Sequence, residues 1–131
     1  SLSIDDTPIG EFTHTQLAAH IELQRYPTTP QSVQAAQVIA MNKKRNETTI
    51  GELRNHWRIS RDLARSERGL AEATDDAGRK RYEASIEKLE KRMEGFEDKL
   101  AEIEKRADEE LAAIYEAAQP VVHRYVLRPT N

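Results

Sequence analysis

The sequence predicts a fold dominated by α-helix, in which residues 30–119 form a long antiparallel helical hairpin of the coiled-coil type on a small base. Charged residues make up 33% of the chain and aromatic residues only 5%, so little apolar material is available for a globular core and elongated helices are favoured. Apolar residues in the second half recur at alternating steps of four and three, the spacing of a coiled-coil seam. An acidic turn at residues 74–78 separates the two arms.

The second arm carries the clearer seam. Its apolar positions are Tyr82, Ile86, Leu89, Met93, Phe96, Leu100 and Ile103. The first arm accepts the same frame but is less apolar, and its seam positions are Ala36, Ile39, Lys43, Asn46, Ile50, Leu53, Trp57, Ser60, Ala64, Glu67 and Ala71.

A single register aligns the two arms. In an antiparallel hairpin the residue numbers of facing layers add to one constant total. Four pairs share that total: Leu53 with Leu100, Trp57 with Phe96, Ile50 with Ile103, and Ile39 with Ile114. We therefore expect a fold-back near residue 76, with Leu53, Trp57, Phe96 and Leu100 in the hairpin core.

The same register predicts opposite charges beside the seam. Three arginines of the first arm fall opposite three glutamates of the second, and the pairs are Arg54 with Glu97, Arg61 with Glu90, and Arg68 with Glu83. Exposed ion pairs contribute only about 0 to 1 kcal/mol each. We expect them to set register and orientation, while the apolar layers supply the stability.

Residues 1–29 are expected to form an N-terminal arm and a short helix. Residues 1–10 show little periodicity and predict an arm or loop, with a short strand near residues 9–12. Residues 13–24 have an apolar side and a threonine at the start, which favours a helix. Thr29 is the expected N-cap of the first arm, and Pro30 suits its first helical position, where the missing N–H is not needed.

Local signals mark a turn and a possible break. Asp75 or Asp76 is expected to cap the second arm by accepting hydrogen bonds from its first N–H groups, and Gly78 to ease the bend. The stretch at residues 48–52 has the pattern of a capping box. The sequence therefore leaves two alternatives for the first arm: a continuous helix, or a kink near residues 47–51.

The C-terminal segment, residues 120–131, is expected to pack at the hairpin base. Pro120 ends the second arm, and the alternation from residue 121 to 127 predicts a strand. A lone strand would leave its backbone unpaired, so it needs a partner from the N-terminal arm or from another subunit.

No arrangement of residues points to catalysis. The histidines are His14, His20, His56 and His123, and none has a metal-ligand spacing to another His, while Cys is absent. No Gly-rich phosphate loop, nucleophile motif or convergent acid pair is present. We expect a protein that is not an enzyme and uses no cofactor or metal.

Nucleic acid and membranes are not the expected partners. Five arginines occur in the first arm between residues 54 and 68, but three already have glutamate partners in the predicted register, and the formal net charge is -3. No apolar run approaches the roughly 20 residues of a membrane span. No signal peptide is visible, which favours a cytoplasmic location.

Ile59, Leu63 and Leu70 lie beside the first arm's predicted seam, so a hairpin alone would leave them uncovered. A second hairpin is the simplest cover, which predicts a dimer or higher homo-oligomer. The leading hypothesis is thus a non-enzymatic module that self-associates and holds an unidentified protein partner. A nucleic-acid-associated accessory protein remains an alternative.

A second alternative rests on a short resemblance. The turn from Ala73 to Asp76, followed by Tyr82 and Ile86, resembles the helix–helix turn of bacterial four-helix sensor domains. This resemblance implies a ligand-sensing helical bundle and assigns no role to individual residues.

Overall fold

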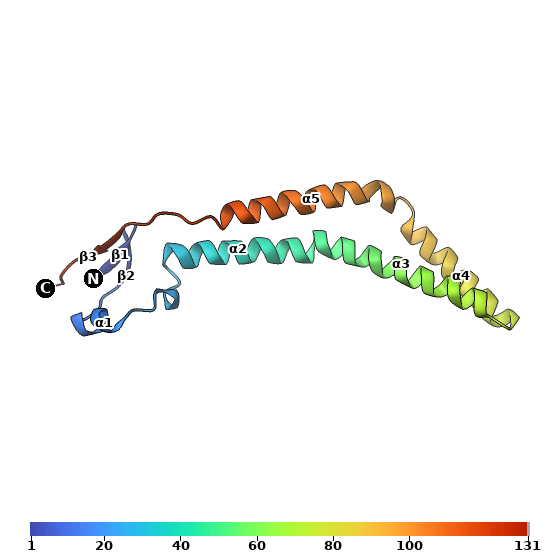
Figure 1. The fold of residues 1–131 in the computed structure, drawn as a ribbon, viewed down its shortest axis with the longest axis horizontal. Helices are drawn as coiled ribbons and strands as arrows, with labels where there is room; N and C mark the ends of the chain where they lie inside the picture. The colour runs from blue at the N-terminus through green and yellow to red at the C-terminus, as the bar shows by residue number, and fades with distance from the viewer. Residues whose placement is uncertain (131) are drawn as a thin grey trace. The chain divides into compact units, whose positions relative to one another are not determined.

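The computed structural model describes residues 1–130 and is mainly helical, as expected (Figure 1). Its elements in order are β1 Leu2–Ile4, β2 Thr7–Gly10, α1 His14–Ala19, the 3₁₀ helix η1 Leu23–Arg25, α2 Pro30–Glu47, α3 Thr49–Glu72, α4 Asp76–Met93, α5 Phe96–Ala117 and β3 Tyr125–Leu127. The chain divides into two compact units, residues 1–43 with residues 111 onward, and residues 44–110.

A small antiparallel sheet organises the first unit. The strand order is β2-β1-β3, with Leu2 opposite Leu127 and Ile4 opposite Tyr125. A two-residue turn joins β1 to β2, and its residues Asp5 and Asp6 have φ angles of 48° and 66°. Aspartate tolerates this left-handed conformation better than most residues, and positive φ at both positions suits a hairpin.

The sheet revises two expectations from the sequence. Residues 1–10 form a hairpin in place of an arm or loop, because Asp5 and Asp6 supply the turn. The C-terminal strand covers only Tyr125–Leu127 and not the whole of residues 121–127. Its partner is β1, so the expected pairing with the N-terminal segment is confirmed.

The core of the first unit lies on this sheet. Leu2, Ile4 and Ile9 are buried, and Ile4 is fully enclosed. Phe12, Leu23 and Tyr26 pack against them. The rings of Phe12 and Tyr26 meet edge to face, with centroids 5.6 Å apart, a favourable geometry for aromatic pairs.

The helix expected at residues 13–24 is shorter than predicted. Thr13 and Gln16 form a capping box, which starts α1. The helix ends at Ala19 because His20 has a φ of 111°, which no right-handed helix accommodates. The remainder contains only the 3₁₀ turn η1.

The start of α2 confirms the predicted boundary. Thr29 is buried, and its hydroxyl oxygen accepts a hydrogen bond from the Ser32 backbone N–H at 3.2 Å. Pro30 is the first helical residue. The buried hydroxyl also donates to the Tyr26 carbonyl at 3.0 Å, which ties the cap to the preceding turn.

The first arm changes helix at Thr48 without losing its backbone hydrogen bonds. The Thr48 N–H donates to Lys44 and the Thr48 carbonyl accepts from Glu52, each at 2.9 Å. The Thr48 hydroxyl donates back to the Lys44 carbonyl and makes no cap bond to α3. The expected capping box is therefore not formed, and the helical path runs on with a one-residue irregularity.

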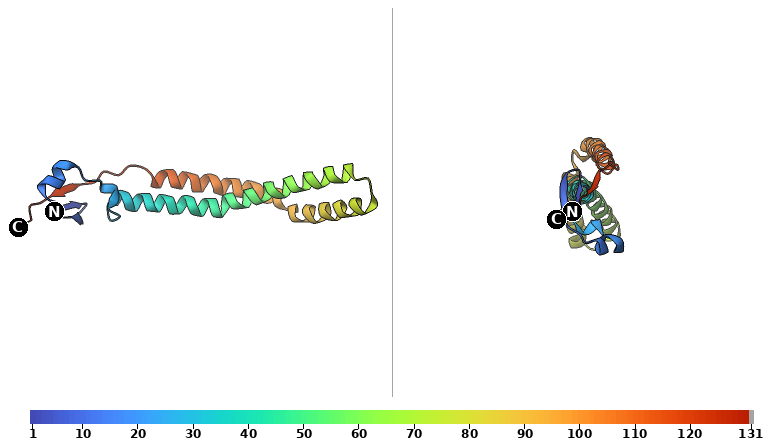
Figure 2. Two further views of the ribbon diagram at one scale, coloured as in Figure 1. Left: turned by 90° about the horizontal axis from the view of Figure 1, so that it is seen from below. Right: turned by 90° about the vertical axis from the view of Figure 1, so that its left-hand side faces the viewer.

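In the second unit, α3 and α4 lie side by side and are joined by a short turn (Figures 1 and 2). Asp75, one of the two residues expected as the cap, caps α4 by accepting a hydrogen bond from the Gly78 N–H at 2.6 Å. Gly78 itself lies inside the first turn of α4 with no positive φ, so its expected role in easing the bend is wrong.

Gly95 interrupts the second arm, which the seam pattern had treated as one helix. It lies between α4 and α5 with a φ of 69°. Glycine adopts this conformation without the steric penalty that other residues pay, and for that reason it often ends helices. An isolated glycine within a helical pattern can indicate a helix end. Here the apolar spacing continues on both sides of Gly95, which favoured one unbroken helix.

Small residues on α3 let α4 approach closely. The Ser66 and Ser85 hydroxyl oxygens are 3.1 Å apart. The Tyr82 ring lies directly over Gly69, where an added Cβ would come within 2.4 Å of the ring. A larger residue at either α3 position would push the two helices apart.

Candidate interaction surface

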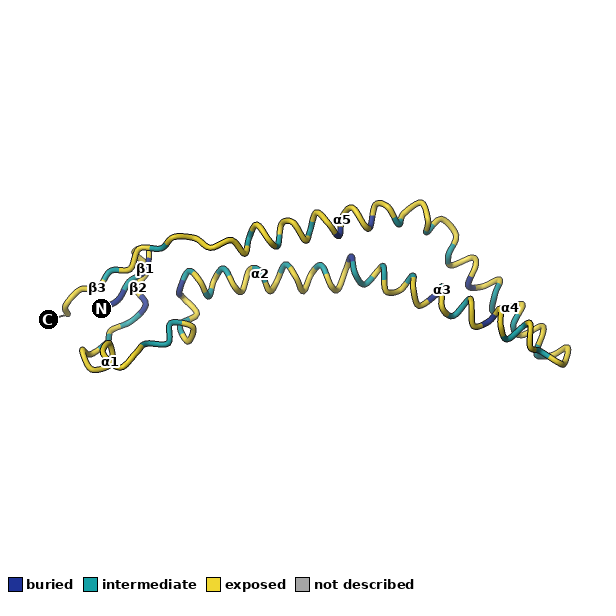
Figure 3. Tube along the Cα trace, in the orientation of Figure 1, coloured by how far each residue is buried: buried dark blue, intermediate teal, exposed yellow. Residues whose placement is uncertain are grey.

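The seam predicted for the second arm agrees with the observed burial. Leu89 and Ile103 are buried, and the remaining predicted positions are half-buried, including Phe96 and Leu100 (Figure 3). Figure 3 shows these points of burial separated by exposed turns. Clear apolar spacing was sufficient to identify this face.

The seam predicted for the first arm is displaced by one residue. Trp57 is 63% exposed and is not in the core, whereas Ile59 is only 5% exposed. Leu63 and Leu70 are half-buried, so of the three residues expected to need a second hairpin only Ile59 is fully covered within the chain. Leu53, the other predicted core residue of this arm, is half-buried.

The displacement has a physical reason. A shift of one position turns a helix face by about 100°. The observed face places Ile59, Leu63 and Leu70 on the covered side, together with Ser66 and Gly69, the small residues that α4 approaches. The predicted frame would have buried one large indole ring and left three aliphatic side chains outside the contact.

Phe96 consequently has a different partner from the predicted Trp57. Its ring stacks on the His56 imidazole, with centroids 3.5 Å apart and planes 6° from parallel. The buried Nδ1 atom of His56 has no hydrogen-bond partner among residues 1–130. The sequence had indicated only that this histidine has no metal-ligand spacing to another His.

None of the three predicted arginine–glutamate pairs forms an ion pair within the described chain. Arg54 donates instead to the Asn46 carbonyl at 3.2 Å, and Arg61 lies 3.8 Å from Asp62. The displaced seam accounts for this, because turning the first arm carries its flanking arginines away from the predicted line of contact.

The observed polar anchors of this unit were missed by the sequence analysis. Arg106 donates from Nε to the Thr49 hydroxyl at 3.2 Å and pairs with Glu52 at 2.8 Å. Arg45 donates to the Ala107 carbonyl at 3.1 Å. Thr49 is fully buried, so the Arg106 contacts tie α5 to the start of α3, and the Arg45 bond ties α5 to the end of α2. Neither arginine is part of a sequence motif or a regular spacing that would mark it as a contact residue.

An exposed patch surrounds Trp57 on α3, and we call it the tryptophan patch. It consists of Trp57 with Arg54 and Arg61, three residues before it and four after it on the helix surface, and Arg58, the next residue in the chain. Arg58 donates to the Asn55 side chain at 2.8 Å, which leaves its charge uncompensated. The patch thus joins a large aromatic surface to three guanidinium groups.

A second feature of the same unit is an open hollow of about 530 Å³, which we call the acidic hollow. Leu63 and Met93 are its apolar residues. Its charged lining consists of Glu87, Glu90, Glu94 and Lys91. The carboxylates of these three glutamates make no ion pair or hydrogen bond within residues 1–130.

The first unit contains a cluster that joins the β1–β2 turn to the segment before β3. Asp5 accepts from the Arg124 backbone N–H at 2.8 Å and lies 2.5 Å from His123 Nδ1. The Asp6 carboxylate pairs with the Arg124 guanidinium at 2.8 Å. The hydrogen bond from Arg124, followed by that with His123, lowers the pKa of Asp5 below its ordinary value.

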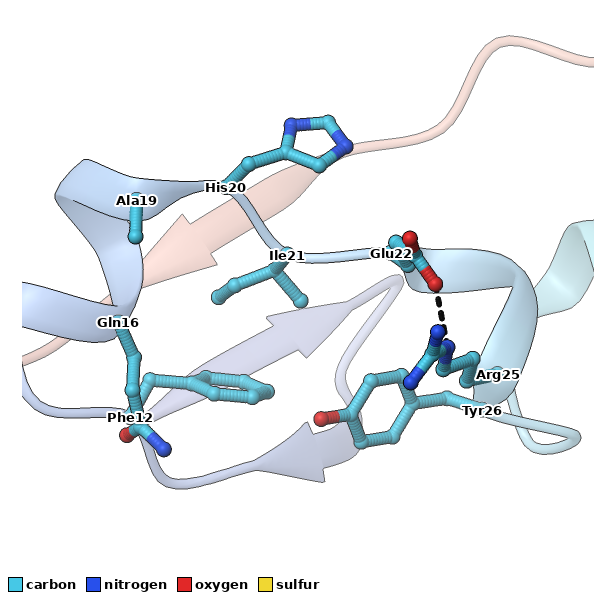
Figure 4. A pocket seen from close by; sticks show the side chains of 8 residues that line it. All are labelled: Phe12, Gln16, Ala19, His20, Ile21, Glu22, Arg25 and Tyr26. Carbon is cyan, nitrogen blue, oxygen red and sulfur yellow. Dashed lines mark ion pairs between the residues drawn. The ribbon is translucent and has the colours of Figure 1, made fainter.

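A surface hollow of about 460 Å³ lies between α1 and η1 (Figure 4). Its lining residues are Phe12, Gln16, Ala19, His20, Ile21, Glu22, Arg25 and Tyr26. Glu22 and Arg25 pair with each other, as the dashed line shows. The hollow therefore offers a ligand no uncompensated carboxylate or guanidinium, and it is a weaker candidate than the tryptophan patch.

Metal binding and membrane crossing find no support in the part of the chain that the structure describes. Residues 1–130 contain no cluster of three or more His, Asp or Glu side chains placed to hold a metal ion. No helix among them has the length and apolar character needed to cross a membrane.

Comparisons with protein-family models, with curated proteins and with solved structures found no match to this chain. The functional argument therefore rests on the two features of the second unit, the tryptophan patch and the acidic hollow.

Proposed function

We propose that the protein is a non-enzymatic interaction and assembly module that self-associates through its helical hairpin. The observation that carries this proposal is the exposure of Trp57, which is 63% exposed midway along α3. Among the described residues, the arginines near it do not pair with the glutamates predicted as their partners. Tryptophan and arginine are enriched at the energetic centres of protein interfaces. On a helix face that contacts only solvent, a tryptophan side chain would have no structural role.

The hairpin itself supports this role. We propose that α3 and α4 pair as an antiparallel coiled coil, because their covered residues recur at steps of three and four and because Ser66 meets Ser85 across the pair. Such a hairpin presents its outer faces to a partner while its inner face holds it together. The many exposed charges keep it soluble.

Light scattering after size exclusion tests self-association over a range of micromolar concentrations. We expect a mass above the 15.0 kDa of one chain that increases with concentration. Trp57→Ala should shift this equilibrium toward the monomer, whereas Ile39→Ala, which removes another exposed apolar side chain, should not. A strict monomer at every concentration would contradict the proposal.

Nucleic-acid binding is the second candidate, and one observation favours it. The glutamates predicted to neutralise Arg54, Arg61 and Arg68 do not pair with them in the described chain. Phosphate contacts make affinity fall steeply with salt. Gel shifts at low salt with duplex DNA, single-stranded DNA and RNA test this candidate. The absence of any shift at micromolar protein would exclude it, and replacing the three arginines by glutamine is the matched control.

A further inference from the structure

We infer that the Trp57 side chain of one copy inserts into the acidic hollow of a second copy. This inference rests on the proposed self-association and specifies its contact. The tryptophan patch and the acidic hollow both belong to residues 44–110, so each copy carries both halves of the contact. The occupant is a second copy of this chain because the two halves complement each other in charge and each offers the other an exposed apolar surface.

The donor half is an apolar knob with a basic rim. Trp57 is exposed, Arg54 and Arg61 neighbour it on the helix surface, and Arg58 follows it directly in the chain. Asp62 lies 3.8 Å from Arg61 on the exposed surface and is the only carboxylate in an ion pair with any of these arginines among residues 1–130. The rim therefore keeps a positive balance.

The acceptor half is an apolar floor with an acidic rim. Leu63 and Met93 supply the apolar surface, and a thioether makes favourable contacts with an aromatic ring. Three glutamates against Lys91 leave the rim negative. The hollow has a volume of about 530 Å³, within the usual range for small-molecule pockets, so it has room for an indole ring.

Docking of one copy on another accounts for two features of the single chain. It covers an exposed indole, and it brings arginines without a glutamate partner in the described chain to glutamates whose carboxylates have no partner there. Opposite rim charges steer encounter and fix orientation, while the buried aromatic supplies most of the affinity. Removing a central tryptophan of this kind weakens binding by on the order of 30-fold or more.

The first test uses fluorescence, because Trp57 is the single tryptophan of the chain. We expect its emission to shift to the blue and its quenching by iodide to fall as concentration rises, in step with the mass measured by light scattering. Oligomers whose Trp57 emission and quenching stay constant would overturn this inference and leave the proposed function standing. A monomer at all concentrations would overturn both.

The second test exchanges charges between copies. One variant carries Arg54→Glu and Arg61→Glu, and the other carries Glu87→Arg and Glu90→Arg. Each alone should lose association while keeping its helical circular dichroism. A mixture of the two should regain it, because both rims are complementary again in the mixed complex.

The control variant is Glu83→Arg, which changes a charge of α4 outside the hollow and should leave association unchanged. Recovery of association only in the mixture identifies the rims as the contact. Variants that associate as strongly alone as the native chain, or a mixture that stays monomeric, would overturn the inference.

Discussion

At the scale of single residues, Asp5 shows how much one side chain contributes to joining distant parts of the chain. Its carboxylate and backbone N–H both bond to Arg124, and its carboxylate also meets His123. These contacts lie beside β1 and β3, whose pairing closes the sheet. Favourable contacts to the ionised carboxylate are what lower its pKa.

Asp5→Asn should destabilise the sheet at neutral pH while keeping a residue that tolerates positive φ. Because the pKa of Asp5 is lowered from its ordinary value of 3.8, the stabilisation is complete above that value and is lost as pH falls through the folded-state pKa. Thermal unfolding should thus show a lower midpoint for Asp5→Asn at neutral pH, with the difference shrinking in strong acid.

Asp6→Asn is the matched control for this pH dependence. It removes the neighbouring carboxylate, whose one polar partner among residues 1–130 is the exposed Arg124 guanidinium. We expect a smaller loss of stability from this change. A constant difference between Asp5→Asn and the native chain at all pH values would contradict the assigned role of the Asp5 carboxylate.

Gly69→Ala tests the close contact between α3 and α4. Alanine normally stabilises a helix interior by about 0.5 to 1 kcal/mol relative to glycine. Here the new Cβ would lie 2.4 Å from the Tyr82 ring, so the ring must move and the free energy of unfolding should fall. Gly51→Ala is the control, since its nearest neighbour would be 3.7 Å away, and it should raise that free energy in urea unfolding.

At the scale of elements, the central relation is the packing of α3 against α4. The turn capped by Asp75 returns the chain, and the Ser66–Ser85 contact fixes which residues meet. The contact is local, because the two helices are consecutive and joined by only a few residues. Local antiparallel helix pairs form readily because little loop entropy is lost.

Cysteines in place of Ser66 and Ser85 should form a disulfide within one chain. The two Oγ atoms are 3.1 Å apart, and small shifts bring sulfur atoms to bonding distance. The chain has no native cysteine to interfere. Non-reducing electrophoresis should show a monomer band with altered mobility at all concentrations. Crosslinks found only between chains would show that α3 and α4 pair in trans, and Ser60→Cys with Ser85→Cys is the mismatched control.

At the scale of the whole molecule, the contacts gather in two units with separate cores. Ile4 is buried in the sheet of the first unit, and Ile59 is buried on α3 in the second. Replacing a buried isoleucine by alanine costs about 2 to 5 kcal/mol. The unit in which each substitution lowers the local stability shows how independently the two units are stabilised.

We expect Ile59→Ala to reduce amide hydrogen-exchange protection in α3 and α4 while the amides of β1 and β3 keep theirs. Ile4→Ala should give the reverse pattern. Hydrogen exchange followed by mass spectrometry measures both. Equal loss of protection in both units from either variant would show a single cooperative unit instead.

The sequence alone determined the features that depend on neighbouring residues. The helical character, an aspartate cap at Asp75 or Asp76, the start of α2 at Thr29 and Pro30, and the covered face of the second arm all follow from local chemistry or from strong apolar spacing. The need for a partner of the C-terminal strand followed from its unpaired backbone, and the structure chose the N-terminal segment over another subunit.

Only the tertiary structure decided which face of the first arm is covered. Trp57 and Ile59 lie two residues apart, and both frames place apolar residues at steps of three and four, so periodicity could not choose between them. The choice depends on packing: Ser66 and Gly69 let α4 come close on one face, and three aliphatic side chains fill that contact better than one indole. The same choice leaves Trp57 in solvent, where the proposed interaction begins.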